Sequence, residues 1–226
     1  MIGLIDYGAG NLRSVEFALD RLGVEHVRAV RPEELAGADG VILPGVGAAA
    51  RAMAELSARG WPAALRSSPV PLLGVCLGMQ LLCESSDEGG VLTPGLGLIP
   101  GTVSRFAWDV PAGGTPVGGT QVASVDATSS SPRLPVPHIG WARVKVRSED
   151  ELFEGIADGE YFYFLHSYRA SCPAPVVSAT AEYGQRFPAA IRVGRVAGVQ
   201  FHPEKSGPAG GRLLANFCAV SAGCAA

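Results

Sequence analysis

Charged residues are scarce in this chain of 226 residues. Asp, Glu, Lys and Arg together make up 17% of it, against a share of about a quarter in ordinary globular domains. Basic residues are not in excess either, because 18 Lys and Arg face 21 Asp and Glu, for a net charge of −3. A protein that neutralises the phosphates of DNA or RNA carries a surplus of basic side chains. We therefore expect no nucleic-acid partner.

Long apolar runs are also lacking. The longest apolar stretch, Val70 to Cys83, is interrupted by Pro71 and Gly74 and is shorter than the run of about 20 residues that crosses a bilayer. The first ten residues include Asp6 and no Lys or Arg, unlike a secretory signal or a transit peptide. These features predict no membrane partner and a cytoplasmic location.

The cysteines form no pairing pattern. They are odd in number and include no Cys-x-x-Cys pair: Cys76, Cys83, Cys172, Cys218 and Cys224. Such a set predicts neither a disulfide framework nor a zinc site. No metal or nucleotide motif is evident, so we expect no cofactor. With neither role indicated, the cysteines are candidates for a nucleophile.

What the first half does contain is a regular alternation of elements. Apolar runs typical of strands occupy residues 2–6, 24–30, 40–43 and 70–75. Helical spacing of apolar residues covers 11–23 and 48–59, and a third helix is expected from Cys76 onward. Asn11 is expected to cap the first helix and Gly23 to end it. The alternation predicts a parallel sheet with helices on both faces.

The second half reads differently. Strands are expected at 143–146, 161–169, 176–183, 189–193 and 196–201, with helix returning only near 209–220. Gly194-Arg195 predicts a two-residue turn between the last two strands. We expect an antiparallel extension of the same sheet within one domain, 1–226. Gly, Pro, Ser and Thr fill 15 of the 25 positions from Pro111 to Pro135, so we interpret 107–135 as a surface insertion.

One cysteine has the setting of a nucleophile. Gly74-Val75-Cys76-Leu77-Gly78 follows an apolar strand and precedes a helix, as in a nucleophile elbow with cysteine in place of serine. The flanking glycines remove Cβ atoms from a tight turn, and a helix N-terminus favours a thiolate. The alternative is a small buried cysteine in a Gly-rich turn.

A base and an oxyanion site complete the hypothesis. His202 and Glu204 lie two residues apart at the end of a predicted strand, so their side chains share a face. The imidazole could then take the thiol proton while the carboxylate orients it. A strand-end histidine beside a solvated glutamate is the alternative. The N–H of Leu77 and the glycines of Pro44-Gly45-Val46-Gly47 could stabilise an oxyanion.

Five segments together resemble a known family. They are PGVG (44–47), GVCLGMQ (74–80), PHIGW (137–141), HSYR (166–169) and VQFHPEKS (199–206). The set resembles class I glutamine amidotransferases, and the opening IDYGAGNLRSV with PHIGW resembles the glutaminase subunits of imidazole glycerol phosphate synthases, which act in histidine biosynthesis. The likeness spans nearly the whole chain. It implies a flavodoxin-like α/β fold, a single domain with a mixed, largely parallel central sheet flanked by helices, and no cofactor.

The resemblance also assigns roles to residues. It implies a catalytic triad and an oxyanion site made of Cys76, His202, Glu204, Gly45, Val46, Gly47 and Leu77. The substrate glutamine is expected to contact Gln80, Glu88, Ser167 and Tyr168. Contact with a (β/α)₈-barrel cyclase, in a heterodimer, is expected at Asn11, His138, Trp141, Tyr163 and Lys205. The alternatives are core aromatics at 141 and 163, a solvated carboxylate at 88 and a surface charge at 205.

The chain departs from the family pattern at a few positions. Ala142 stands where a polar residue is expected, Val199 replaces a threonine, and Arg195 replaces an asparagine. None of them touches the triad. Three other functions stay open: a glutaminase that serves another synthase, such as one forming pyridoxal phosphate; a γ-glutamyl hydrolase that works without a partner; and a binding subunit with an inactive site. The last is disfavoured because nucleophile, base and orienting carboxylate are all present.

Overall fold

The computed structural model describes residues 1–8, 10–106, 134–147 and 150–224 of the chain, without the side chain of Cys224. The expected insertion at 107–135 lies outside these residues except for Leu134 and Pro135. Within the described residues no helix is both long and apolar enough to span a membrane.

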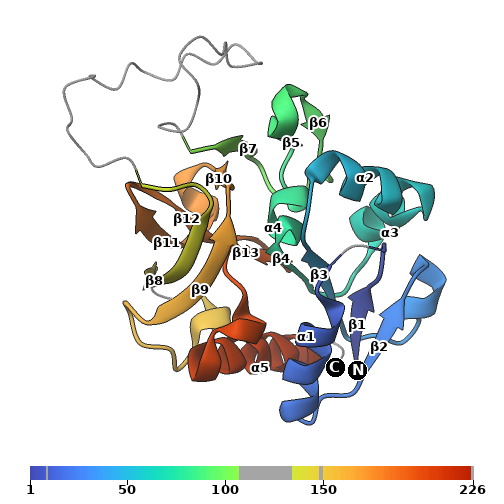
Figure 1. The fold of residues 1–226 in the computed structure, drawn as a ribbon. Coiled ribbons are helices and arrows are strands. Elements are labelled where there is room, and N and C mark those ends of the chain that lie inside the picture. Colours follow the sequence, from blue (N-terminus) through green and yellow to red (C-terminus); the bar gives the residue numbers. More distant parts are fainter. Residues whose placement is uncertain (9, 107–133, 148–149, 225–226) are drawn as a thin grey trace.

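A nine-stranded sheet runs through the molecule in the order β2-β1-β3-β4-β13-β12-β11-β8-β9 (Figure 1). Its parallel half consists of β1 (Ile2–Ile5), β2 (His26–Ala29), β3 (Gly40–Gly45), β4 (Leu72–Cys76) and β13 (Val196–Val199). Its antiparallel half consists of β12 (Gln185–Val193), β11 (Val177–Tyr183), β8 (His138–Val146) and β9 (Tyr161–His166). The prediction of one mixed sheet is confirmed.

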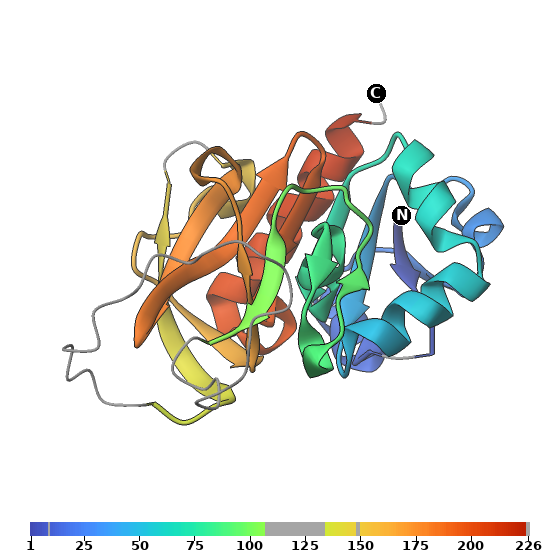
Figure 2. The same ribbon diagram turned by 90° about the horizontal axis from the view of Figure 1, so that it is seen from above.

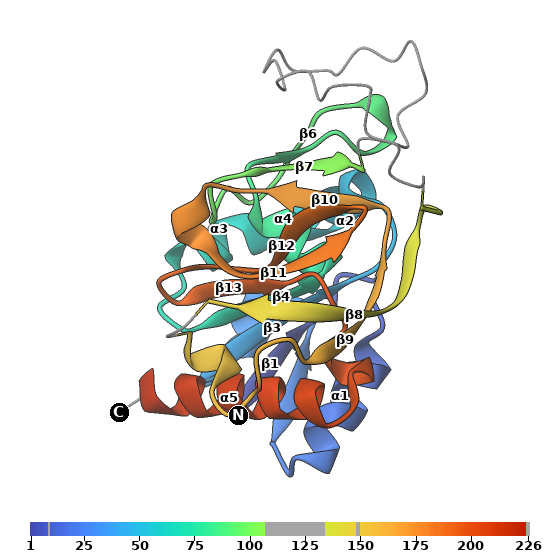
Figure 3. The same ribbon diagram turned by 90° about the vertical axis from the view of Figure 1, so that its left-hand side faces the viewer.

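Helices cover both faces of the sheet, as the alternation of elements predicted (Figures 2 and 3). On one face lie α1 (Leu12–Arg21) and α5 (Gly207–Cys224), whose apolar residues join one buried cluster. On the other face lie α2 (Ala49–Ala58), α3 (Trp61–Ser67) and α4 (Leu77–Leu82), which join a second cluster. Because both faces are covered, every residue of β1, β3 and β4 is buried.

A second, smaller sheet was not predicted. It has the order β10-β7-β5-β6 and consists of β5 (Ser85–Ser86), β6 (Thr93–Pro94), β7 (Thr102–Arg105) and β10 (Tyr168–Ser171). The single strand expected at 161–169 is wrong, because the chain leaves β9 at His166 and enters the small sheet at Tyr168. Helix α3 was also missed. Short 3₁₀ turns occupy Pro32–Leu35, Glu88–Gly90, Glu151–Phe153, Ala174–Val176 and Pro203–Lys205.

Of the residues predicted to form turns or helix caps, the two glycines behave as expected and Asn11 only in part. Gly23 (φ +66°) directly follows the C-terminal cap of α1, and Gly194 (φ +55°) begins the two-residue link between β12 and β13, as expected. Asn11 does occupy the N-cap of α1, but its side chain makes no capping hydrogen bond there. Its backbone (φ −90°, ψ 58°) departs from the extended conformation typical of a capping residue.

Glycine at two positions lets α4 lie directly on the sheet. A Cβ atom on Gly78 would come within 1.8 Å of the Leu43 carbonyl oxygen, and one on Gly74 within 2.7 Å of the Gly78 carbonyl. Both obstacles are backbone atoms, which cannot rotate away as a side chain does. The sequence Gly-x-Cys-x-Gly therefore sets the distance between α4 and the strands β3 and β4.

We expect Gly78→Ala to destabilise the fold by about 3 kcal/mol, since an added methyl group in a close-packed region costs about 1–3 kcal/mol and this one meets backbone. The control is Gly211→Ala in α5, where nothing lies within 4 Å of the added Cβ. That change should stabilise the protein by up to about 1 kcal/mol through helix propensity. Urea unfolding of both variants measures the difference, and equal stabilities would contradict the close approach.

Candidate active site

Cys76 ends β4 in a strained conformation. Its φ of +55° and ψ of −109° make it the one non-glycine residue with positive φ in the described part of the chain. This region is disfavoured for side chains with a Cβ, and residues held in such conformations cluster at functional sites. The chain turns at Cys76 directly into α4, so the predicted nucleophile elbow is present in geometry.

The register of the sheet gathers the other candidate residues around this cysteine. Strand β4 lies between β3 and β13, with Gly45 paired to Cys76 on one side and Val199 paired to Val75 on the other. The carboxyl ends of parallel strands meet at one edge of a sheet, where ligands of open α/β folds bind. The loop after Gly45 and the segment carrying His202 therefore flank Cys76.

His202 and Glu204 form a buried pair. The imidazole Nδ1 lies 2.9 Å from Glu204 Oε1, and the two side chains are 3% and 1% exposed. The backbone N–H of His202 donates to the carbonyl of Tyr163 in β9 at 2.8 Å, which ties this segment to the edge of the sheet. Glu204 therefore binds Nδ1 and leaves Nε2 as the nitrogen available for proton transfer.

The charge of His202 depends on its neighbours. Burial alone lowers the pKa of an imidazole, but interactions with Cys76 and Glu204 outweigh burial and raise the pKa of His202 to about 10. The ring is consequently protonated at neutral pH. An imidazolium beside a cysteine at a strained turn is the resting arrangement of a thiol nucleophile and its acid–base partner.

A cavity of about 280 Å³ opens above Cys76. Nine of the residues assigned from the resemblance line it. They belong to the expected triad, the oxyanion site and the glutamine site: Val46, Gly47, Cys76, Leu77, Gln80, Glu88, Ser167, Tyr168 and His202. Gly45 and Glu204 are not among its lining residues. The volume is at the small end of ligand pockets, which suits a ligand of amino-acid size.

The polar side chains of the cavity are held by the protein. Gln80 Nε2 donates to the carbonyl of Tyr168 at 2.9 Å and to Gln200 Oε1 at 3.0 Å, which leaves Gln80 with only its Oε1 acceptor to offer. Glu88 Oε2 accepts from the N–H of Ala49, the first residue of α2, at 2.5 Å. These contacts fix the positions of the Gln80 and Glu88 side chains.

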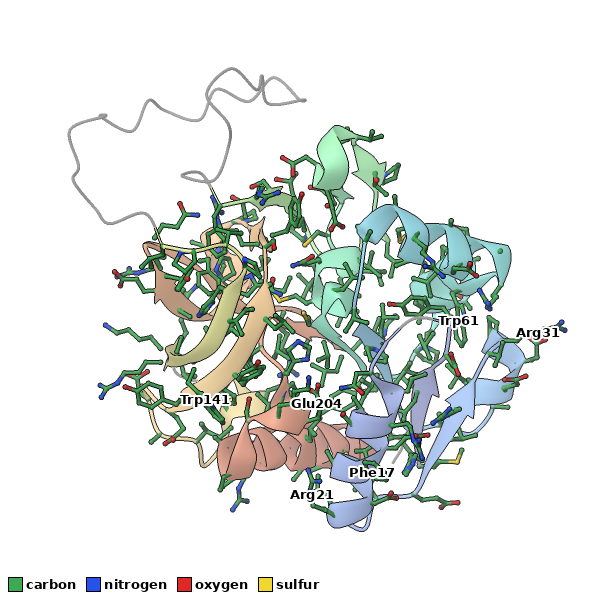
Figure 4. The ribbon with its side chains drawn as sticks, in the orientation of Figure 1. Phe17, Arg21, Arg31, Trp61, Trp141 and Glu204 are labelled. Carbon is green, nitrogen blue, oxygen red and sulfur yellow. The ribbon has the colours of Figure 1, made fainter. Side chains whose placement is uncertain are left out.

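Three of the residues assigned to a partner contact form one surface. Trp141 on β8 is 55% exposed and meets the ring of Tyr163 on β9 at 6.0 Å, while Lys205 Nζ lies 6.0 Å from the centre of the same ring. Figure 4 shows Trp141 toward the periphery and Glu204 toward the middle of the molecule. Asn11 is half-buried before α1.

The assignment of His138 to a contact surface needs correction. Its side chain is 3% exposed and stacks between the rings of Tyr183 (4.0 Å) and Phe164 (5.1 Å). Along β8 the residues 138, 140, 142 and 144 face inward, whereas 139, 141 and 143 face outward. His138 and Trp141 are three residues apart and therefore lie on opposite faces of the strand.

Sequence reasoning missed the residue that His138 supports. His166 lines the cavity, its Nδ1 lies 2.8 Å from the Tyr168 carbonyl, and its Nε2 lies 3.1 Å from His138 Nδ1. A carbonyl only accepts, so His166 donates through Nδ1 and accepts from His138 through Nε2. Burial lowers the pKa of His166 to about 3 and that of His138 to about 4, so both rings are neutral. The motifs HSYR and PHIGW contained both histidines, but only a structure reveals their contact.

The charge assigned to His202 is open to direct measurement. By NMR, the His202 ring should remain protonated up to a pH of about 10. In Cys76→Ala, burial still lowers this pKa while one of the two raising interactions is gone, so the titration should move toward the ordinary value of about 6.5. His166, whose ring is neutral, serves as the internal control. An unchanged His202 titration in Cys76→Ala would show that the interaction with Cys76 does not raise the pKa of His202.

Comparison with known proteins agrees with this geometry. Residues 3–220 match the family described as glutamine amidotransferase class-I. The imidazole glycerol phosphate synthase subunit HisH of Bacillus cytotoxicus is 42% identical, over 97% of this chain and 95% of that protein. The HisH subunit of Moorella thermoacetica is 46% identical, over 96% and 93%.

Solved structures share the fold. A glutamine amidotransferase crystal structure aligns with a TM-score of 0.68 at 23% identity, across 98% of each chain. The PurLQS structure of Thermotoga maritima aligns with a TM-score of 0.64 at 20% identity, across 96% of this chain and 97% of that one. At such identities the likeness concerns the fold alone, whereas the curated relatives are similar over nearly their full length. The chain therefore belongs to the class I glutamine amidotransferases, in the family of imidazole glycerol phosphate synthase HisH subunits.

Proposed function

We propose that this chain hydrolyses glutamine at Cys76 and delivers the ammonia to a cyclase subunit of imidazole glycerol phosphate synthase in histidine biosynthesis. The observation that carries the proposal is the position of Cys76. It ends a parallel strand in a strained conformation, faces a cavity sized for an amino acid, and lies beside the buried His202–Glu204 pair.

The reaction follows from the groups around the sulfur. The Cys76 thiolate attacks the side-chain carbonyl carbon of glutamine, and the C–N bond breaks as His202 gives its proton to the leaving nitrogen, which departs as ammonia. The neutral imidazole then takes a proton from water, whose oxygen attacks the carbonyl carbon of the thioester. The C–S bond breaks, glutamate is released after its carboxyl group loses a proton to solvent, and the thiolate and protonated imidazole are restored. Glu204 keeps the ring oriented through Nδ1 in both steps.

Stabilisation of the oxyanion is assigned to the turn beside Cys76. The N–H groups in the first turn of a helix have no partner within the helix, and Leu77 is the first residue of α4. Gly45 is in register with Cys76, and a Cβ there would come within 2.8 Å of the Gly78 nitrogen. The backbone of residues 45–47 therefore runs close enough to Leu77 for both to bind one developing negative charge.

The recognition of glutamine rests on the groups that remain available in the cavity. We assign the ammonium group of glutamine to the acceptors Gln80 Oε1 and Glu88, because the N–H groups of Gln80 are already engaged. Ser167 and Tyr168 also line the cavity, and the Tyr168 carbonyl accepts the hydrogen bond from Gln80. Ser167 lies between β9 and β10, where the chain passes from one sheet to the other.

The partner surface is assigned to the outer faces of β8 and β9. Ile139 is 60% exposed and Trp141 55%, and the register pairs them with Leu165 and Tyr163 of β9. A contiguous exposed apolar patch of this kind marks an interaction site. Leu165 also lines the cavity, so the patch begins where the cavity ends. This continuity supports delivery of ammonia to a barrel-shaped cyclase in a heterodimer.

The requirement for a thiolate favours a reducing compartment. The described cysteines with described side chains are all free, and disulfides are rare in the cytoplasm because thiols are kept reduced there. We place the reaction in the cytoplasm.

Loss of the thiol separates glutamine hydrolysis from the synthase reaction. In the complex with its cyclase, Cys76→Ala should lose glutamine-dependent synthesis by more than about 10⁴-fold, as expected for removal of a nucleophile. Synthesis from ammonium salts should continue, since the cyclase receives ammonia from solution. Cys218→Ala, which removes a remote thiol in α5, is the matched control. Glutamine hydrolysis at the native rate in Cys76→Ala would refute the assignment of Cys76 as the nucleophile. Loss of the ammonium-dependent reaction would refute the assignment of that reaction to the cyclase subunit alone.

The partner surface has its own test. Trp141→Ala should raise the Kd for the cyclase subunit about 30-fold, equivalent to about 2 kcal/mol for a buried aromatic anchor. Stability should hardly change, because the side chain is exposed in the free chain. Val193→Ala serves as control, since Val193 is also exposed but lies at the hairpin between β12 and β13. Calorimetric titration measures both, and equal affinities would place the interface elsewhere.

A further inference from the structure

Gln200 contacts the reactive sulfur but belongs to none of the roles described above. It follows β13 directly, is 0% exposed, and places its side-chain nitrogen 3.8 Å from Cys76 Sγ. Its backbone N–H donates to the carbonyl of Ala189 in β12 at 2.8 Å. Polar groups buried this completely are nearly always hydrogen-bonded. The partners of the Gln200 amide therefore determine which of its two ends faces the sulfur.

The orientation of this amide is determined by Gln80. Gln80 Nε2 donates to the backbone carbonyl of Tyr168, which can only accept, and to Gln200 Oε1. The oxygen of Gln200 therefore faces Gln80, and its N–H groups face the sulfur. Gln80, which donates to both the Tyr168 carbonyl and Gln200, thus connects the cavity wall through Gln200 to the nucleophile.

The sulfur has a second contact of the opposite kind. Cys76 Sγ lies 3.6 Å from the carbonyl oxygen of Leu165. A carbonyl accepts a hydrogen bond from the neutral thiol and repels a thiolate, whereas an amide N–H donates to a thiolate. Hydrogen bonding to the charged form favours that form. Of the two contacts, the one made by Gln200 favours the reactive state.

We propose that Gln200 is a further catalytic residue, whose amide N–H binds the Cys76 thiolate and holds it for attack, with Gln80 as the positioning residue that orients the amide. The inference rests on the proposed function only in taking Cys76 as the nucleophile. It assigns Gln80 a second task beside glutamine binding and links the cavity wall to the reactivity of the sulfur.

A hydrogen bond to the sulfur has two opposing effects on the rate at which Cys76 reacts: it increases the thiolate fraction and lowers the nucleophilicity of each thiolate. A tenfold larger thiolate fraction is accompanied by about a threefold lower reactivity per thiolate, because the nucleophilicity of sulfur falls with its basicity with a slope of about 0.4–0.5. In the part of the pH profile where Cys76 is only partly ionised, removal of the N–H donor should therefore slow its reaction about threefold and move the profile to higher pH. At alkaline pH the variant should react faster than the native chain.

The experiment uses alkylation by iodoacetamide between pH 6 and 10, with modification of each cysteine followed by peptide mass spectrometry. Gln200→Met keeps the length and removes both polar groups, and Gln200→Asn keeps an amide but withdraws it by one methylene from the sulfur. In both variants Cys76 should react more slowly than in the native chain at lower pH and faster at alkaline pH, so that the two reactivity profiles cross. Half-buried Cys172 is the internal control and should react as in the native chain. Gln80→Met should reproduce part of the shift, because Gln200 then loses the donor that orients it.

Two outcomes would overturn the role proposed for Gln200. A Cys76 profile identical to the native one in both Gln200 variants, with thermal unfolding showing that either is folded, overturns the proposal. An equal change at Cys76 and Cys172 also overturns it, because it indicates altered packing. The readout needs no glutamine turnover: if the native complex fails to hydrolyse glutamine while the crossover is present, the proposed function fails and the role of Gln200 stands.

Discussion

The parallel pairing of β4 with β3 on one side and β13 on the other brings Cys76, the loop after Gly45 and the segment that carries His202 to one place. Gly45 is in register with Cys76, and the chain that leaves Val199 carries Gln200 and then His202 past the same sulfur. Glycine at 78 lets α4 lie against the carbonyl of Leu43 on the face of these strands. A shift of one residue in either pairing would separate the thiol from the groups around it and would also turn the buried side chains of the shifted strand to the opposite face.

Sequence predicted the parts of this arrangement that depend on local chemistry. The elbow at Cys76 is visible because glycines at fixed spacing flank a cysteine between an apolar strand and a helix. The parallel half of the sheet is visible because strand and helix periods alternate. The small sheet is not, since strands such as Ser85–Ser86 are too short to show a period. The break at Ser167 follows from pairing with β7, which is distant in sequence.

Three buried histidines show how neighbours decide charge. His138, His166 and His202 are 3%, 6% and 3% exposed, so burial alone would make all of them neutral. Only His202 has a carboxylate and a thiol as partners, and only its pKa rises. The other two meet each other and a carbonyl. Residue type and burial could not have separated these roles from sequence, because the distinction lies in contacts between β8, β9 and the segment after β13.

The position of β9 at the end of the sheet has a consequence for the solution behaviour of the chain. An edge strand exposes backbone groups that can pair with another molecule and start aggregation. At Tyr163 the carbonyl accepts from the His202 N–H, and the N–H donates to Ser206 Oγ. The segment that carries His202 thus also occupies backbone groups at the middle of this edge, so the two hydrogen bonds that tie this segment to β9 also protect the strand from pairing with a second copy.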